Sequence, residues 1–279
     1  MLTSFDRHGP LLPASPVVVS VPHAGRHYPP ELIERLRVPF RHLLPLEDRY
    51  VDTLALAAHG GETLLIARRP RAWIDLNRGE HERDPRVDDG ASARLVPLQS
   101  SKVRGGLGLI PRRAAGASEI WARRWSADAV VARIVGDHRP YHAALAQALS
   151  DARARFGVAV LLDLHSMPPL GGARPARLVI GDRFGRSAAS RFVGRIEGCA
   201  RRADFTVALN TPYAGGHILE RHAAPGKGIH AIQLEIDRSL YLDAQLSEPG
   251  KGFDAVAALL REVLDALADE ACPLAAAAE

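Results

Sequence analysis

Short apolar runs recur along the chain, each bounded by proline, glycine or charged residues. Runs that are apolar throughout are typical of strands buried on both faces of a sheet. The pattern predicts strands at 16–21, 62–67, 71–78, 158–165, 176–180, 205–208 and 229–238. Between them it predicts helices at 30–37, 53–59, 119–156 (interrupted near Arg139–Pro140), 187–203 and 253–268.

Strands and helices alternate from one end of the chain to the other, with no internal repeat and no linker-like stretch. This alternation predicts an α/β fold in which a mixed, mostly parallel sheet is covered by helices on both faces. We therefore expect one three-layer domain over residues 1–279.

Polar residues follow two of the predicted central strands. The run at 158–165 ends in Asp163, Leu164 and His165, and the run at 16–21 leads through Pro22 to His23. Ligands bind at the carboxyl ends of strands in open α/β sheets. Either histidine could ligate a metal, with Asp163 as the carboxylate that orients His165, or it could simply form a hydrogen bond at the strand end.

Three carboxylates have two readings each. Glu47 and Asp48 stand where acids suit the start of a helix, but one of them could be an oxygen ligand to a metal. Glu235 alternates with apolar residues, as in a half-exposed strand, but it could also point into a cleft as a general base.

Three further segments bear on the candidate chemistry. Asn77 and Arg78 form a pair suited to binding an anion, because a guanidinium binds carboxylate with two hydrogen bonds. Residues 79–118 lack a sustained period, and we expect them to form an irregular cover over the site. A glycine-rich turn at 210–217 lacks the Gly-Lys-Ser/Thr of a phosphate loop, so it is not interpreted as nucleotide-binding.

Composition narrows the functional class of the protein. The chain has 279 residues, 47% hydrophobic and 5% aromatic, with a formal net charge of +4. Its arginines are scattered rather than clustered, which argues against a nucleic-acid partner and suits a small anionic substrate. Cys199 and Cys272 form no metal-spaced pair and no disulfide framework. Without an apolar run long enough for a membrane span, the expected location is the cytoplasm, with no membrane partner.

Together, His23, His165, Asp48 (or Glu47) and Glu235 have the composition of a hydrolytic zinc site. Two imidazoles and one carboxylate would hold one Zn²⁺ per chain, or another divalent metal, and Glu235 would be the base. Asn77 and Arg78 would hold the carboxylate of the substrate.

The chain also resembles the N-formylglutamate amidohydrolase family, whose members hydrolyse N-formyl-L-glutamate to formate and L-glutamate, a reaction of histidine catabolism. The resemblance rests on eight segments in the family's order, at 19–25 (VSVPHAG), 48–52 (DRYVD), 75–78 (DLNR), 139–142 (RPYH), 163–168 (DLHSMP), 181–182 (GD), 212–216 (PYAGG) and 233–241 (QLEIDRSLY).

That family is similar in turn to zinc carboxypeptidases and aspartoacylases, which implies a zinc-carboxypeptidase-like (phosphorylase/hydrolase-like) fold. The resemblance implies that His23 and His165 are metal ligands and that Glu235 is the base. It implies substrate binding by four residues: Asn77, Arg78, Tyr213 and Gly216. The carboxypeptidase spacing His-x-x-Glu would put a glutamate at position 26, where Arg26 stands, so Asp48 is the expected carboxylate ligand and Glu47 the alternative.

Several alternatives stay open on the sequence. The accepted acyl group and amino acid, the role of residues 79–118, and the choice between a monomer and a small homo-oligomer are not fixed. Within the hydrolases, the rival is a related N-acyl amino acid acylase or a carboxypeptidase-like peptidase. From another class, the rival is a non-catalytic basic protein that binds anions or nucleic acid.

Overall fold

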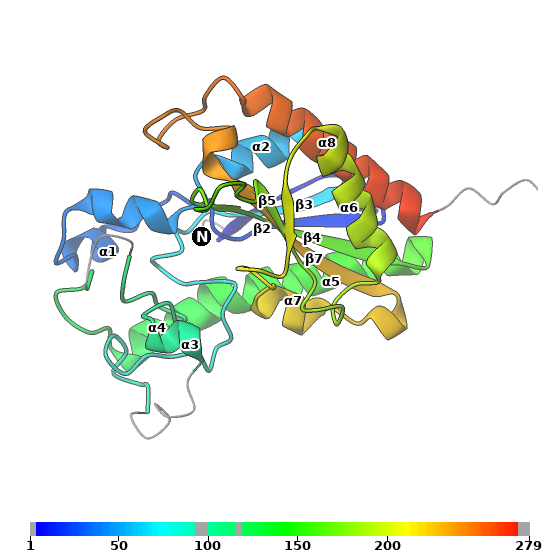
Figure 1. The fold of residues 1–279 in the computed structure, drawn as a ribbon. Coiled ribbons are helices and arrows are strands. Elements are labelled where there is room, and N and C mark those ends of the chain that lie inside the picture. The colour runs from blue at the N-terminus through cyan, green and yellow to red at the C-terminus, as the bar shows by residue number, and fades with distance from the viewer. Residues whose placement is uncertain (1–3, 93–99, 115–118, 273–279) are drawn as a thin grey trace, which may run out of the picture. The chain divides into compact units, whose positions relative to one another are not determined.

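The computed structural model describes residues 4–92, 100–114 and 119–272, and its centre is one seven-stranded sheet (Figure 1). The strand order is β1-β3-β2-β4-β7-β5-β6. The strands are β1 (Phe5–His8), β2 (Val17–Val21), β3 (Thr63–Ala67), β4 (Ala159–Met167), β5 (Leu178–Gly181), β6 (Val207–Leu209) and β7 (Ile229–Asp237). β4 runs parallel to both β2 and β7, whereas β5 is antiparallel to β7 and parallel to β6. The predicted α/β fold with a mixed sheet is confirmed.

Eight α-helices are present in the described residues, together with shorter 3₁₀ and π segments. The α-helices are α1 (Pro30–Glu34), α2 (Val51–Ala58), α3 (Ser101–Arg104), α4 (Ala127–Arg133), α5 (Arg139–Phe156), α6 (Ser190–Arg202), α7 (His217–His222) and α8 (Phe253–Ala271). The 3₁₀ segments are η1 (Phe40–Leu46), η4 (Pro225–Lys227) and η5 (Arg238–Leu240), and η3 (Ile134–His138) is π-helical. None of the described helices is long and apolar enough to cross a bilayer.

The chain divides into two compact units. The first comprises Met1–Asp6, Pro22–Asp48 and Ile66–Ala144, and the second Arg7–Val21, Arg49–Leu65 and Leu145–Glu279. A single hydrolase domain over residues 1–279 stays a prediction.

In the second unit, apolar strands form the core. Every residue of β2 and β4 is buried, as expected of strands covered on both faces. Helix α8 packs against both α2 and α6, and α2 and α8 contact β2 and β4. Figure 1 shows these three helices on one side of the sheet and α7 with the second half of α5 on the other.

The strand predicted at 71–78 is wrong. This segment of the first unit is a series of turns, although Trp73, Ile74 and Leu76 are buried as the apolar pattern suggested. Its hydrogen bonds run to loop backbone and to side chains rather than to a neighbouring strand; for example, Asp75 N donates to Leu109 O at 2.8 Å. The apolar residues therefore predicted burial correctly here but not the type of secondary structure.

Other differences concern element ends. The helical stretch begins at Ala127 rather than at 119, and its interruption is the π-helical η3 just before Pro140. Strand β4 continues to Met167, so His165 lies inside it. Strand β1 and helix α7 were not predicted. Residues 79–118 are largely irregular as expected apart from α3, with 93–99 and 115–118 outside the described residues.

Candidate functional site

In the first unit, His23 and Asp48 form the first part of the site. His23 follows β2, and the Asp48 amide donates to the His23 carbonyl at 3.0 Å, which holds the two residues together. Both side chains are buried, and His23 Nδ1 lies 3.6 Å from Asp48 Oδ2. Two ligand atoms about 2.0–2.2 Å from a tetrahedral zinc are separated by roughly 3.3–3.6 Å, so the spacing of this pair fits an ion between them.

The orientation of His23 is set by Asp75. His23 Nε2 donates to Asp75 Oδ1 at 2.8 Å, which leaves Nδ1 as the nitrogen whose lone pair faces Asp48. Burial alone would raise the pKa of Asp75, but the charges of Arg71, His23 and Arg78 hold this pKa well below its ordinary range. Asp75 is therefore an ionised acceptor. A buried carboxylate behind a histidine is the usual support for a metal ligand.

In the second unit, His165 has the same arrangement. Its Nε2 donates to Asp163 Oδ2 at 2.9 Å, and Ser20 Oγ donates to Asp163 Oδ1 at 2.8 Å. All three side chains are buried. The expectation that Asp163 orients His165 agrees with this geometry, in which Nδ1 is the nitrogen that could bind a metal.

Glu235 lies beside His165, because β4 and β7 pair in parallel with His165 opposite Glu235. Paired residues of neighbouring strands leave the same face of a sheet. Glu235 is 7% exposed, so the half-exposed reading of β7 is wrong. Gln233 Nε2 donates to Glu235 Oε1 at 2.9 Å, and the Gly216 amide donates to Gln233 Oε1 at 3.2 Å. These bonds connect the carboxylate to the glycine-rich turn.

The glycine-rich turn packs closely against the end of β5. A Cβ on Gly181 would meet the Gly215 amide nitrogen at 2.8 Å, and Gly215 itself has a φ of +106°. Both glycines are therefore required for this close approach. Tyr213 and Gly216, predicted to bind substrate, are partly exposed within this turn.

Asn77 and Arg78 are both buried in the first unit. Arg78 Nε donates to the Leu107 carbonyl at 2.8 Å, and Nη1 donates to the Asn77 carbonyl at 2.7 Å. The backbone N–H of Asn77 donates to Asp75 Oδ1 at 2.9 Å. The pair predicted to bind an anion is thus hydrogen-bonded to the carboxylate that orients His23.

Glu47, the alternative ligand, accepts a hydrogen bond from the Tyr28 hydroxyl and is buried. The reading of Glu47 and Asp48 as helix-start acids is wrong, because α2 begins only at Val51 and both acids are buried before it.

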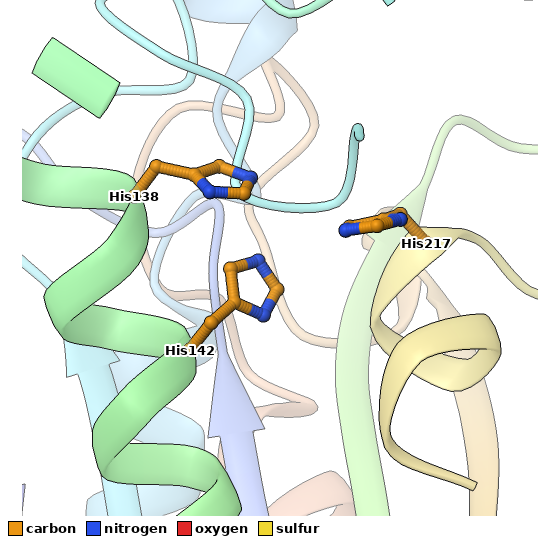
Figure 2. A group of neighbouring side chains, drawn as sticks. All are labelled: His138, His142 and His217. Carbon is orange, nitrogen blue, oxygen red and sulfur yellow. The ribbon is translucent and has the colours of Figure 1, made fainter. Parts of the chain in front are cut away.

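His and Asp side chains able to hold a metal ion fall into two groups among the described residues: His23, Asp48 and His165, and His138, His142 and His217. The second group was not predicted. Figure 2 shows His138 and His142 on successive turns of one helix. The two histidines are four residues apart, and this spacing in the sequence could have suggested that they share a face of a helix.

Comparisons with known proteins agree on one family. The family model for N-formylglutamate amidohydrolase matches residues 15–242. N-formylglutamate deformylase of Pseudomonas aeruginosa is 27% identical over 264 residues, covering 90% of this chain and 92% of that protein. The Pseudomonas putida enzyme of the same name is 30% identical over 239 residues, covering 82% of each chain.

A solved structure gives the same answer at the level of the fold. The crystal structure of N-formylglutamate amidohydrolase from Ralstonia eutropha JMP134 superposes with a TM-score of 0.86 at 33% identity, over 96% of this chain and 98% of that one. The chain belongs to the N-formylglutamate amidohydrolase family.

Proposed function

We propose that this protein is a metal-dependent amidohydrolase that cleaves N-formyl-L-glutamate to formate and L-glutamate. The observation that carries the proposal is the register of β4 and β7, which sets His165 beside the buried Glu235. A metal-ligating imidazole next to a carboxylate outside the ligand set is the arrangement that hydrolysis of an amide needs. The relatives named as N-formylglutamate deformylases support the substrate.

The proposed ligands are His23, Asp48 and His165, with Glu47 as the alternative carboxylate. The donor set suits one Zn²⁺ per chain, and another divalent metal is compatible with it. The spacing of His23 and Asp48 supports this assignment, as do the two carboxylates that fix the histidines through Nε2. A bound zinc ion would supply a Lewis acid that makes water nucleophilic near neutral pH and polarises the formyl carbonyl.

Protein side chains carry the remaining steps. Glu235 accepts a proton from the attacking water and returns it to the departing nitrogen as the C–N bond breaks. Arg78 and Asn77 bind a substrate carboxylate and so orient the formyl group, with Tyr213 and Gly216 completing the substrate contacts. A cytoplasmic location and a monomeric or small homo-oligomeric state stay predictions.

The test combines metal analysis of the purified protein with an assay of formate release. We expect one zinc per chain and turnover of N-formylglutamate. Glu235→Gln should keep the metal and lose about three orders of magnitude in kcat, because only the base is removed. Glu262→Gln is the matched control and should keep full turnover, because Glu262 is a partly exposed glutamate of α8 that pairs with Arg202 of α6.

The outcomes separate the alternatives. Near-full turnover of Glu235→Gln would reject its role as the base. A panel of N-acyl amino acids and short peptides distinguishes the deformylase from a related acylase or a carboxypeptidase-like peptidase. A protein without stoichiometric metal that binds nucleic acid in a steeply salt-dependent manner would support the non-catalytic alternative.

A further inference from the structure

The segment 75–78 holds its shape without belonging to a strand. Two of its carbonyls accept hydrogen bonds from within it: the Arg78 amide donates to the Asp75 carbonyl at 3.1 Å, and Arg78 Nη1 donates to the Asn77 carbonyl at 2.7 Å. The other two carbonyls, those of Leu76 and Arg78, accept from a helix instead.

The donors on that helix are His138 and His142. His142 Nε2 donates to the Leu76 carbonyl at 3.0 Å, and His138 Nε2 donates to the Arg78 carbonyl at 2.8 Å. A carbonyl oxygen only accepts, so Nε2 carries the hydrogen in both rings. Both histidines are 0% exposed, and their ring centroids lie 4.4 Å apart, an arrangement visible in Figure 2. The accepting carbonyls belong to the residues immediately before and after Asn77 in the sequence.

A third residue of the same helix extends the contact. Arg133 Nη1 donates to the Trp73 carbonyl at 3.1 Å, and its guanidinium lies 3.5 Å from the centre of the Trp73 ring. In a regular α-helix, Arg133 and His138 would point about 140° apart, because each residue turns the helix by about 100°. The π-helical turn Ile134–His138 between them adds the residue that brings both onto the face that contacts 73–78.

We propose that His138 and His142 are positioning residues for substrate binding: they hold the backbone on both sides of Asn77 so that Asn77 and Arg78 are preset for a carboxylate. The inference rests on the proposed function, since it assigns the pair to the substrate carboxylate. Without these donors, two buried carbonyls would lose their partners and the segment would shift to regain them. A preset clamp binds more tightly because less ordering remains to be done on binding.

The experiment compares His142→Leu with His142→Gln, and His138→Leu with His138→Gln. Glutamine keeps an N–H donor at about the reach of Nε2, whereas leucine removes it. His59→Leu is the matched control, because His59 Nε2 also donates to a carbonyl, that of Glu62, which lies outside 73–78. Each variant is assayed with N-formylglutamate and with a neutral formamide, and calorimetry measures the binding of glutarate.

We expect each leucine variant to raise KM for N-formylglutamate and Kd for glutarate roughly tenfold, the usual scale of one buried hydrogen bond, with kcat within about twofold. The glutamine variants should restore most of this loss. KM for the neutral formamide should not change in any of them, and His59→Leu should match wild type throughout.

Equal loss for the neutral formamide, no rescue by glutamine, or unchanged glutarate binding would each overturn the inference. Failure of the proposed function looks different. In that case the wild-type protein releases no formate but still binds glutarate, and Arg78→Ala abolishes this binding. The glutarate affinities of the histidine variants then decide on their own whether His138 and His142 position Asn77 and Arg78.

Discussion

Two histidines of this chain are oriented in the same way. His23 donates through Nε2 to Asp75, and His165 donates through Nε2 to Asp163; both aspartates are fully buried. A carboxylate behind an imidazole fixes its tautomer and makes the opposite nitrogen a better donor to a metal. The proposed zinc affinity therefore depends on residues that do not touch the ion.

Asp163→Asn tests this dependence. The variant removes the negative charge behind His165, so zinc affinity should fall about 10–100-fold. Competition with a chelating dye measures the change. Ser20→Ala is the control, because it removes the other hydrogen bond to Asp163 and leaves the one from His165 intact. Equal zinc affinity in Asp163→Asn and wild type would contradict the role of this carboxylate.

At the scale of single residues, sequence reasoning was strong where the partner is close along the chain. Asp163 stands two positions before His165, so its orienting role could be predicted and agrees with the structure. The partner of His23 stands 52 positions away and was missed, because only tertiary packing brings Asp75 to it. His138 and His142 were missed as well, since nothing local shows that their rings meet loop carbonyls.

Among elements, one arginine of α8 connects the end of α2 with the residue that precedes β3. Arg261 on α8 donates to Glu62 through Nη1 at 3.1 Å and to the last carbonyl of α2, that of Ala58, at 2.7 Å. Burial alone would raise the pKa of Glu62, but hydrogen bonds from Arg261 and the Gly60 amide lower it below its ordinary 4.5. The carboxylate therefore stabilises the fold above pH 4.5, and this contribution is lost as the pH falls through the lowered pKa.

Glu62→Gln should consequently lower the free energy of unfolding by about 1–2 kcal/mol at pH 7, and by progressively less as the pH drops below 4.5. Urea denaturation at several pH values measures this. Asp265→Asn, which alters the exposed partner of Arg261, should change stability little at any pH. A destabilisation of Glu62→Gln that is independent of pH would show that the ionised form is not the stabilising one.

Element type was predicted well for the central strands and poorly in the first unit. The runs at 16–21 and 158–165 are mostly apolar, and every residue of β2 and β4 is buried because both faces of the sheet are covered. The segment 71–78 also contains buried apolar residues, Trp73, Ile74 and Leu76 among them, yet it forms turns rather than a strand. Periodicity reports burial, and it does not distinguish between a strand and a turn segment held by side chains.

For the molecule as a whole, metal binding should be coupled to folding, because the proposed ligands His23, Asp48 and His165 lie far apart in the sequence. An ion bound by all three would stabilise the folded state over the unfolded one by mass action. The family was predictable from motifs spread over most of the chain, whereas the division into units was not, because no linker marks it.

Metal removal should therefore lower the melting temperature. A hundredfold excess of zinc over its Kd is worth about 2.7 kcal/mol, which corresponds to roughly 5–10 °C for a protein of this size. Differential scanning calorimetry with and without a chelator measures the shift. His165→Ala should lose most of the chelator effect, and an equal effect in the variant would argue against His165 as a ligand.

The π-helical turn before Pro140 should tolerate amino-acid substitutions but not deletions. Val135 is 52% exposed, and a Cβ on Gly136 would meet no atom within 4 Å, so amino-acid exchanges at either position should be accepted. Deleting either residue should disrupt the contact with Trp73, because the π-helical turn would become a regular α-helical one. Arg133 would then rotate away from Trp73 while His138 stayed in place. This stretch is free to vary in composition and constrained in length, so natural variation there should consist of replacements and never of single-residue gaps.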